Sequence, residues 1–288
     1  MKKILLTGGS GFIGSNIYEA LQNKYIIDAP TRKELDVRER ERVVEYVKRG
    51  KYDIIFHAAS PCPEKTPERD CFENLFQDML RIFMNFYAVR NECEKIIYCG
   101  SGAEYDKKFD ICNVSETQIG VHVPTDEYGL AKYIINEFAR TSSNIYNLRI
   151  FACFGPREYG TKFITHAIRC CLNHQPITIR QDCYFDYLHI NDLLKYVTYF
   201  IEHDLHYHDY NACSGKKIRL SDIAQRVNMQ MGMQQEILIS TPGFNKEYTA
   251  SNERILSECN MSKTDLMDID QGIAKLVAWE RANHVECV

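Results

Sequence analysis

The sequence has 288 residues, 45% of them hydrophobic and 26% charged, which is the make-up of an ordinary soluble globular protein with a sizeable core. A formal net charge of −4 leaves no basic footprint for nucleic acid, so we expect no nucleic-acid partner. No apolar run is long enough to span a membrane, and glycines interrupt the apolar start too early for a signal peptide. We therefore expect a cytoplasmic protein.

Twelve cysteines and nine histidines could in principle carry chemistry. No cysteines form a CxxC pair or are spaced with histidine as metal ligands are. Cys99, Cys153 and Cys170 stand among apolar residues, where a thiol behaves as a small hydrophobe. We expect reduced cysteines and no metal site.

The first predicted unit is a strand, a glycine-rich turn and an amphipathic helix over residues 2–22. Glycines let the backbone turn sharply and approach a ligand, and the helix that follows directs free N–H groups at the same place. Four glycines in seven residues are more than a tight turn without a ligand needs. The stretch predicts a dinucleotide pyrophosphate site at Gly8, Ser10, Gly11, Phe12, Ile13 and Gly14.

Strands and helices then alternate through the first two thirds of the chain. We expect strands at residues 25–29, 53–58, 95–99 and 145–151, and helices at 39–49, 71–93 and 128–141. This alternation predicts an α/β fold with a doubly wound parallel sheet, in which ligands bind beyond the carboxyl ends of the strands. Ala58 and Ala59 end one such strand and are expected to contact the cofactor.

The pattern loosens after residue 154. We expect short strands near 176–179, 208–212 and 236–239, helices at 163–173, 221–231 and 275–284, and a strand tip with a helix at 186–203. This predicts two domains. Residues 1–154 with about 181–203 would bind the nucleotide, and 155–180 with 204–288 would form a smaller mixed α/β cap.

The helix expected at 71–93 is apolar over a wider arc than one contact with a sheet requires. We expect a homodimer through the helices near 75–92 and 130–141. The alternative is a helix buried within the monomer.

The second strand contains Asp28, and Arg32 follows in the next loop. An acidic residue at the tip of this strand normally receives the ribose 2′-hydroxyl of NAD, whereas a nearby guanidinium can bind the 2′-phosphate of NADP. Because Asp28 precedes the strand tip, the sequence favours NADP, with NAD as the alternative. Asp36 and Val37 are expected to close over the adenine.

Tyr128 and Lys132 stand four residues apart on a predicted helix and so share a face. A lysine ammonium beside a phenol favours the phenolate and lowers the phenol pKa, which suits the tyrosine to acid/base chemistry at a carbonyl or hydroxyl. The lysine can also hold the nicotinamide ribose. Ser101 follows a strand at the ligand-binding edge and can orient the substrate oxygen.

Together these stretches resemble the extended short-chain dehydrogenases/reductases, specifically the nucleotide-sugar epimerase/dehydratase group and its GDP-fucose-synthase-like branch. The resemblance covers roughly the first two thirds of the chain, in TGGSGFIG (7–14), HAA (57–59), Ser101, Tyr128 with Lys132, LRIFACFGPRE (148–158) and FDYLHINDL (185–193). It implies a Rossmann domain, a C-terminal sugar-nucleotide domain, a homodimer, and hydride transfer with Tyr128 as acid/base and Ser101 and Lys132 assisting. The segment TRKEL at 31–35 is similar to NADP-using members.

Departures from the family pattern narrow the reaction. Dehydratases carry Thr-Asp-Glu where this chain has Ser101-Gly102-Ala103, so dehydration lacks its proton carriers. Fucose synthases place a cysteine and a histidine where Ala103 and Lys162 align, so double epimerisation lacks its acid/base pair. Hydride transfer at a keto carbon remains.

Two family motifs that often contact the substrate diphosphate or sugar are also altered in this chain. The arginine of the family's Arg-Asp-Phe/Tyr motif is Phe185 here, and the asparagine of its Leu-Arg-x-x-Asn motif is Ala152. This leaves open a different or smaller substrate. The substrate-binding residues we expect are Ser60, Ser101, Gly102, Ala103, Arg157, Lys162 and Arg180.

Three functions follow. The leading hypothesis is an NADP(H)-dependent 4-keto reductase of a nucleotide-linked deoxysugar, serving polysaccharide biosynthesis. The second is a nucleotide-sugar 4-epimerase that retains NAD. The third is a non-catalytic dinucleotide-binding sensor or scaffold, although such relatives usually lack the Tyr/Lys pair or the glycine spacing.

Overall fold

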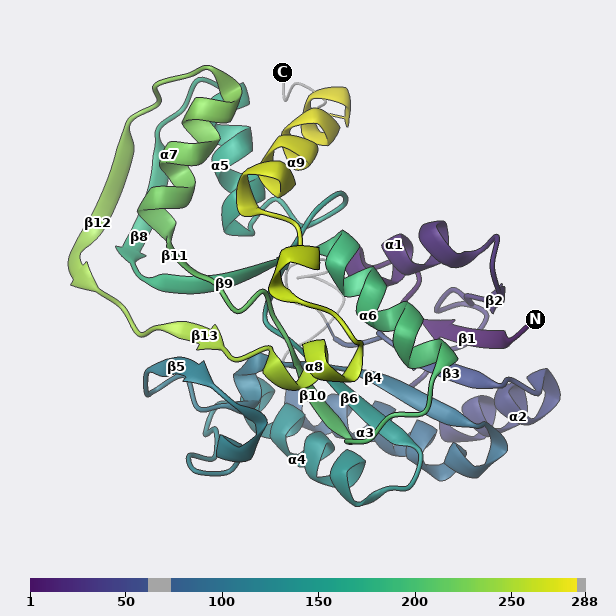
Figure 1. The fold of residues 1–288 in the computed structure, drawn as a ribbon. Coiled ribbons are helices and arrows are strands. Elements are labelled where there is room, and N and C mark those ends of the chain that lie inside the picture. The colour runs from purple at the N-terminus through teal and green to yellow at the C-terminus, as the bar shows by residue number, and fades with distance from the viewer. Residues whose placement is uncertain (62–73, 284–288) are drawn as a thin grey trace.

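The computed structural model describes residues 1–61 and 74–283 of the chain. Its larger sheet has six parallel strands in the order β10-β6-β4-β3-β1-β2 (Figure 1). The predicted doubly wound parallel sheet is therefore confirmed. Its strands are β1 (Lys3–Thr7), β2 (Ile26–Asp28), β3 (Ile54–His57), β4 (Lys95–Ser101), β6 (Ile145–Ile150) and β10 (Asp209–Ala212).

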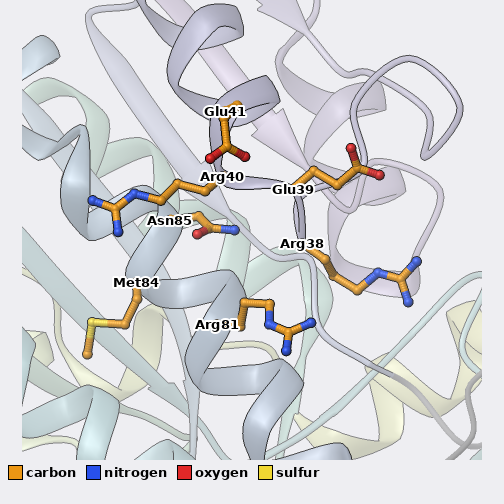
Figure 2. Close-up of a pocket in the computed structure, with 7 residues that line it drawn as sticks. All are labelled: Arg38, Glu39, Arg40, Glu41, Arg81, Met84 and Asn85. Carbon is orange, nitrogen blue, oxygen red and sulfur yellow. The ribbon is translucent and has the colours of Figure 1, made fainter.

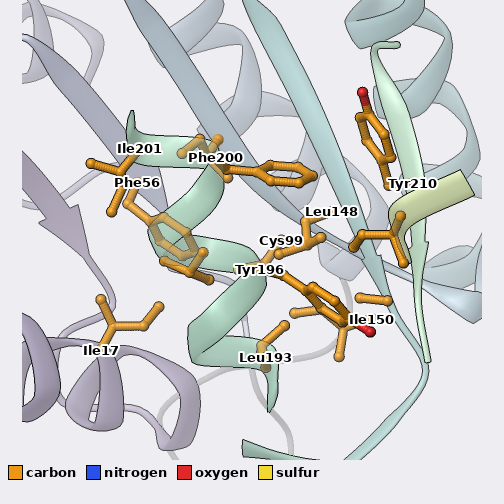
Figure 3. Close-up of a cluster of buried hydrophobic side chains, with 14 of the residues drawn as sticks. Ile17, Phe56, Cys99, Leu148, Ile150, Leu193, Tyr196, Phe200, Ile201 and Tyr210 are labelled. Carbon is orange, nitrogen blue, oxygen red and sulfur yellow. The ribbon is translucent and has the colours of Figure 1, made fainter. Parts of the chain in front are cut away.

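Helices cover both faces of this sheet, because alternate side chains of a strand point to opposite faces. Leu5 belongs to a core shared with α2 (Arg40–Gly50), α3 (Leu75–Ala88) and α4 (Glu127–Thr141). Leu6, its neighbour, belongs to the core shared with α1 (Phe12–Leu21), α6 (Ile190–Glu202) and α8 (Glu253–Glu258). Figure 3 shows α6 lying along this second core, with its apolar side chains against residues of β3, β4 and β6.

A second sheet is assembled from segments that are far apart in the sequence. Its order is β11-β9-β13-β5, with β7 also paired to β9, and a two-stranded sheet of β8 and β12 lies at the outer edge of the molecule (Figure 1). These strands are β5 (Ile111–Val114), β7 (Ala152–Phe154), β8 (Ile177–Asp182), β9 (Tyr184–His189), β11 (Lys217–Arg219), β12 (Ile237–Phe244) and β13 (Tyr248–Ala250).

Three helices pack into a third core beside the second sheet: α5 (Phe163–Leu172), α7 (Leu220–Met231) and α9 (Ile269–Asn283). Short 3₁₀ helices occupy several connections: η2 (Arg90–Glu92), η3 (Gly102–Glu104), η4 (Glu116–Gln118) and η5 (Lys263–Asp265). None of the helices in the described part of the chain combines the length and apolar character needed to cross a membrane.

Some predicted elements differ from those observed. The strand expected in the cap near 208–212 is β10, which pairs in parallel with β6 in the larger sheet. In the other direction, β5 lies within residues 1–154 yet belongs to the second sheet. Chain position alone therefore does not separate the two sheets, and the domain limits stay a prediction.

The long helix expected at 71–93 is described only from Leu75, and residues 71–73 of that prediction lie outside the described part. The α-helix ends at Ala88, where the chain tightens into η2. Its apolar arc is partly accounted for within the monomer, because the rings of Phe83 and Tyr87 contact Phe138 of α4 at centroid distances of 6.2 and 5.4 Å.

Candidate active site

The turn between β1 and α1 is a cradle whose shape depends on missing side chains. Gly8 has a φ of +73°, and a Cβ there would lie 2.7 Å from the amide nitrogen of Ala59. A Cβ on Gly14 would lie 2.2 Å from the carbonyl oxygen of Gly8, so α1 packs directly on the turn. The Gly11 amide closes the turn by donating to the same carbonyl at 2.9 Å.

The first turn of α1 contains no carboxylate of its own. Gly11 is its N-cap and provides no side-chain hydrogen bond, and no acidic residue stands in the first turn. The helix dipole and the backbone N–H groups therefore face the space above the glycines. The residues present fit the pyrophosphate of a dinucleotide, in the place predicted for Gly8, Ser10, Gly11, Phe12, Ile13 and Gly14.

Residues 155–160 fold back over this end of α1. The Asn16 side chain donates to the Pro156 carbonyl at 2.9 Å. A Cβ on Gly11 would lie 3.9 Å from the Tyr159 hydroxyl, so this phenol borders the glycine turn. The loop thus adds a wall to the cradle that local sequence pattern did not predict.

Asp28 is the last residue of β2, at the strand tip and not before it as expected, and its carboxylate is already bound by two phenols. Its carboxylate accepts hydrogen bonds from Tyr46, at 3.0 Å for the nearer oxygen, and from Tyr52. The carboxylate also raises the pKa of both phenols, after burial, which is the larger cause. Asp28 is therefore held toward α2 and the core beneath β2 rather than offered to a ribose hydroxyl.

Arg32 stands in the following loop with about half of its side chain exposed, 3.6 Å from the Asp36 carboxylate. Arg38 binds the same carboxylate at 2.7 Å and is the main reason that the pKa of Asp36 falls to about 2. The Val37 carbonyl accepts a hydrogen bond from Asn85 of α3 at 2.9 Å. The predicted adenosine contacts Arg32, Asp36 and Val37 thus lie in one braced loop.

A shallow hollow extends outward from this loop between the start of α2 and α3 (Figure 2). Three arginines contribute to its walls, Arg38, Arg40 and Arg81, together with Glu39, Glu41, Met84 and Asn85. The surroundings of the predicted adenosine end therefore offer several cationic groups.

The floor between β1 and β3 is a buried polar contact. The Thr7 hydroxyl lies 2.7 Å from Nδ1 of His57 and accepts a hydrogen bond from the Ala59 amide at 3.2 Å. Burial lowers the pKa of His57 to about 3, so its imidazole is neutral at physiological pH. This contact fixes the backbone of Ala58 and Ala59, after which Ser60 is exposed.

The first turn of α4 places Tyr128 beside the loop that follows β4. Asp126 caps this helix by accepting a hydrogen bond from the Gly129 amide at 2.9 Å. A Cβ on Gly129 would lie 2.7 Å from the Ala103 carbonyl oxygen. A glycine at this position therefore allows the helix to approach the Ser101 loop closely.

Lys132 is buried beneath Tyr128. Its ammonium donates hydrogen bonds to the Tyr98 hydroxyl and to the Cys99 carbonyl, both at 2.7 Å, and lies 5.8 Å from the centroid of the Tyr128 ring. Burial lowers the pKa of Lys132 to about 8. The predicted pair thus shares one helix face, with the cation held in place by β4.

Ser101, the last residue of β4, is the N-cap of η3 and forms a capping box with Glu104. Its hydroxyl accepts from the Ala103 amide at 3.2 Å, and Glu104 accepts from the Ser101 amide at 2.9 Å. Glu104 is in turn bound by the fully buried Arg149 at 2.6 Å, and Arg149 also binds Asp209 at 3.0 Å. The loop that presents Ser101 is therefore anchored to β6 and β10.

Lys107 is an exposed second cation beside Tyr128. Its ammonium lies 5.8 Å from the Tyr128 ring centroid. Partial loss of contact with water lowers the pKa of Lys107. The carboxylate of Asp126 raises this pKa, and the positive charge of Lys162 lowers it. Lys107 thus places one cation beside the tyrosine, and Lys162, also exposed, lies near enough to Lys107 to influence its pKa.

Two other predicted substrate residues lie elsewhere. Arg157 is ion-paired with Glu19 of α1, so it braces the 155–160 loop on the cofactor-side helix. Arg180 is exposed on β8, in the outlying two-stranded sheet and well away from β4 (Figure 1). Neither arginine is part of the substrate site proposed below.

Four residues near the site were missed by sequence reasoning: Tyr98, Lys107, Tyr159 and Tyr248. Lys107 follows Ser101 closely, so its place in the same loop was a usable signal. Tyr248 comes from β13 and carries no local signal, because strand pairing alone brings it to the site.

Comparison with known proteins gives concordant results. Residues 4–213 match the model of the NAD dependent epimerase/dehydratase family. The chain is 24% identical to the dTDP-4-dehydro-6-deoxyglucose reductase of Escherichia coli, over 95% of this chain and 96% of that protein. It is 33% identical to the GDP-L-colitose synthase of Yersinia pseudotuberculosis, over 45% and 44% of the two chains.

Among solved structures, the fold is similar to that of a GDP-L-fucose synthetase from Naegleria fowleri bound to NADP. The TM-score is 0.82 at 16% identity, covering 98% of this chain and 94% of the other. At this identity, the likeness concerns the fold alone.

Proposed function

Because the chain belongs to the NAD dependent epimerase/dehydratase family, we propose that it is an NADP(H)-dependent reductase of a nucleotide-linked 4-keto deoxysugar. At the level of the family, it is an NAD(P)-dependent enzyme of the extended short-chain dehydrogenase/reductase type. The observation that carries the finer proposal is the pair of Tyr128 and the buried Lys132, facing a loop that has Gly102-Ala103 in place of two carboxylates.

The proposed chemistry follows from these positions. A bound cofactor supplies the hydride. Tyr128 donates its phenolic proton to the C4 oxygen of the sugar, and the Ser101 hydroxyl hydrogen-bonds the same oxygen. The Lys132 ammonium lies 5.8 Å from the phenol ring and favours the phenolate that is left behind. No carboxylate at positions 102 and 103 is present to remove water from the sugar.

The choice of NADP rests on the adenosine end of the cradle. Asp28 is occupied by Tyr46 and Tyr52, whereas Arg32 keeps about half of its side chain exposed beside Asp36. A guanidinium in this position suits a 2′-phosphate.

The choice of substrate rests on the relatives and on charge. One relative that aligns over nearly its whole length is named for reduction of a 4-dehydro-6-deoxy sugar nucleotide. Lys107 offers positive charge beside Tyr128, and Lys162 lies near Lys107, so this side of the site suits an anionic substrate such as a sugar diphosphate. We propose the same class of substrate here and, with it, a role in polysaccharide biosynthesis in the cytoplasm.

We keep the homodimer through α3 and α4 as part of this proposal. These helices carry apolar residues that the monomer buries only partly, including Leu80 and Met84 of α3 and Phe138 of α4. Light scattering on a sizing column tests it: a mass of about twice that of the chain is expected, and a monomer would remove it.

The test of the function is a reductase assay with dTDP- and GDP-linked 4-keto-6-deoxy sugars. We expect stoichiometric loss of NADPH absorbance and a purified protein from which the nucleotide washes off. Interconversion of 4-epimers with retained NAD and no net oxidation would instead identify a 4-epimerase. NADPH binding without turnover of any keto sugar would favour the non-catalytic sensor or scaffold.

A further inference from the structure

Tyr248 reaches the Ser101 loop from the C-terminal third of the chain. A Cβ on Gly102 would lie 2.3 Å from the Tyr248 hydroxyl oxygen, so this hydroxyl occupies the space where residue 102 would carry a side chain. The phenol therefore takes the place of a side chain at position 102, next to Ser101.

The ring of Tyr248 is fixed by its neighbours. β13 lies between β5 and β9, with Tyr248 in register with Ile111 on one side and Phe185 on the other. The ring centroid lies 4.9 Å from that of Phe151 and 5.4 Å from that of Phe185. Aromatic packing on this scale leaves the hydroxyl little freedom to move away from Gly102.

The hydroxyl lies against Gly102, the residue that follows Ser101. Ser101 and Tyr128 are both near enough to influence the pKa of Tyr248. Burial raises the pKa of Tyr248, so the phenol stays protonated and neutral throughout the working pH range. It is therefore a permanent hydrogen-bond donor next to the proposed acid/base.

We propose that the Tyr248 hydroxyl binds the sugar hydroxyl on C3, next to the reacting C4 carbon, and selects substrates that carry it. Ser101 and Tyr128 both address the C4 oxygen, so a third polar group beside both of them meets the neighbouring substituent. The inference rests on the proposed reductase function and names the substrate more narrowly: a 4-keto sugar with a free C3 hydroxyl. A 3-deoxy sugar leaves the phenol without its partner, which costs binding.

The test is Tyr248→Phe, which keeps the ring and removes only the hydroxyl. Turnover is measured with a nucleotide-linked 4-keto-6-deoxy sugar and with its 3-deoxy analogue. We expect kcat/KM to fall about tenfold for the hydroxylated sugar and to be unchanged for the analogue. Thermal stability and the Kd for NADPH stay as in the wild type. Tyr184→Phe, whose ring stacks on Phe244 in the outer part of the second sheet, is the matched control and leaves both rates unchanged.

An equal loss of kcat/KM on both sugars, or no loss on either, overturns the role of Tyr248. Turnover by the wild type would in that case still support the reductase function. An absence of wild-type turnover on every keto sugar removes both together. A second measurement does not depend on the variant: calorimetric titration of the NADP⁺-loaded wild type with the two sugars. Binding about tenfold tighter for the hydroxylated sugar supports the inference, and equal binding overturns it.

Discussion

The two sides of Tyr128 are built in different ways. The cofactor side is built from one parallel sheet and the helix α4 that packs on it. The glycine turn follows β1, His57 lies on β3, Tyr98 on β4 and Lys132 on α4. On the substrate side, Lys107 lies in the loop before β5 and Tyr248 lies on β13. The pairing of β13 with β5 brings together these segments, which are about 140 residues apart. In the proposed mechanism, the reacting groups therefore come from local motifs, whereas the residue proposed to select the substrate depends on distant strand pairing.

The two sides are joined by the buried charges beneath the Ser101 loop. Arg149 on β6 binds Glu104 in η3 and Asp209 on β10, all with little or no exposed surface. Substitutions on the cofactor side and on the substrate side of Tyr128 should therefore have independent effects, unless they disturb these buried ion pairs. The following predictions use that separation.

The largest expected effect is that of Tyr128→Phe. Loss of the proton donor should lower kcat by about 10²- to 10⁴-fold, while the Kd for NADPH stays nearly unchanged. Steady-state kinetics and fluorescence titration measure the two quantities. Tyr133→Phe on the same helix, whose hydroxyl lies beside Gly120, is the control and should keep full turnover. Comparable turnover in Tyr128→Phe would remove Tyr128 from the mechanism.

Arg149→Met should destabilise the structure on both the cofactor side and the substrate side of Tyr128. It leaves the buried carboxylates of Glu104 and Asp209 without their cation, at a cost of about 3–5 kcal/mol in the free energy of unfolding. Urea denaturation measures this cost. Arg157→Met, which breaks an exposed ion pair with Glu19, should cost less than about 1 kcal/mol. Similar losses in the two variants would mean that the buried network does not anchor the Ser101 loop.

The pH dependence of kcat should report on Lys132. Its pKa is lowered by burial to about 8, so above this pH the ammonium loses its proton and no longer supports the phenolate of Tyr128. Turnover should therefore fall by up to about tenfold per pH unit on the basic side. Stability should change in the opposite sense. Between about pH 8 and pH 10.5 the unfolded chain binds this proton and the native chain does not, so the contribution of Lys132 to stability rises with pH.

A flat kcat profile up to pH 10 would contradict the assigned role of Lys132. Lys132→Met supplies the matched comparison, because it removes the charge at every pH. This variant should be slow throughout and should lack the basic limb.

The smallest expected effect is confined to the adenosine end. Arg32→Ala should raise the Kd for NADPH about tenfold and leave the Kd for NADH unchanged, because only NADPH carries the 2′-phosphate. Lys33→Ala, the exposed neighbour, is the control for general loss of positive charge. Equal losses for both cofactors would show that Arg32 does not select the phosphate.

Local motifs explain which parts of the molecule the sequence predicted. The glycine turn and the Tyr128–Lys132 pair depend on spacing within one strand–turn–helix or one helix, so the residues alone place them. The position of Arg157 depends instead on how residues 155–160 fold back onto α1, through contacts with Asn16 and Glu19. No periodicity in the loop itself encodes that contact.

Strand pairing over long distances explains what was missed. β10 looks like any short strand in the sequence, and only its register with β6 assigns it to the larger sheet. Tyr248 is one of 18 tyrosines in the chain and is distinguished only by the pairing of β13 with β5 and β9. The absence of acids at Gly102 and Ala103 was visible at once, but the phenol that fills the space was not.

The most direct test of the central claim follows the hydride itself. The purified protein is incubated with NADPH deuterated at the transferable position and a nucleotide-linked 4-keto-6-deoxy sugar, and the product is examined by NMR. The account predicts one deuterium at C4 of the sugar, with one NADP⁺ released per product and no solvent deuterium at C3 or C5 when the reaction is repeated in heavy water. Unlabelled product, or interconversion of 4-epimers without oxidation of the cofactor, would contradict it.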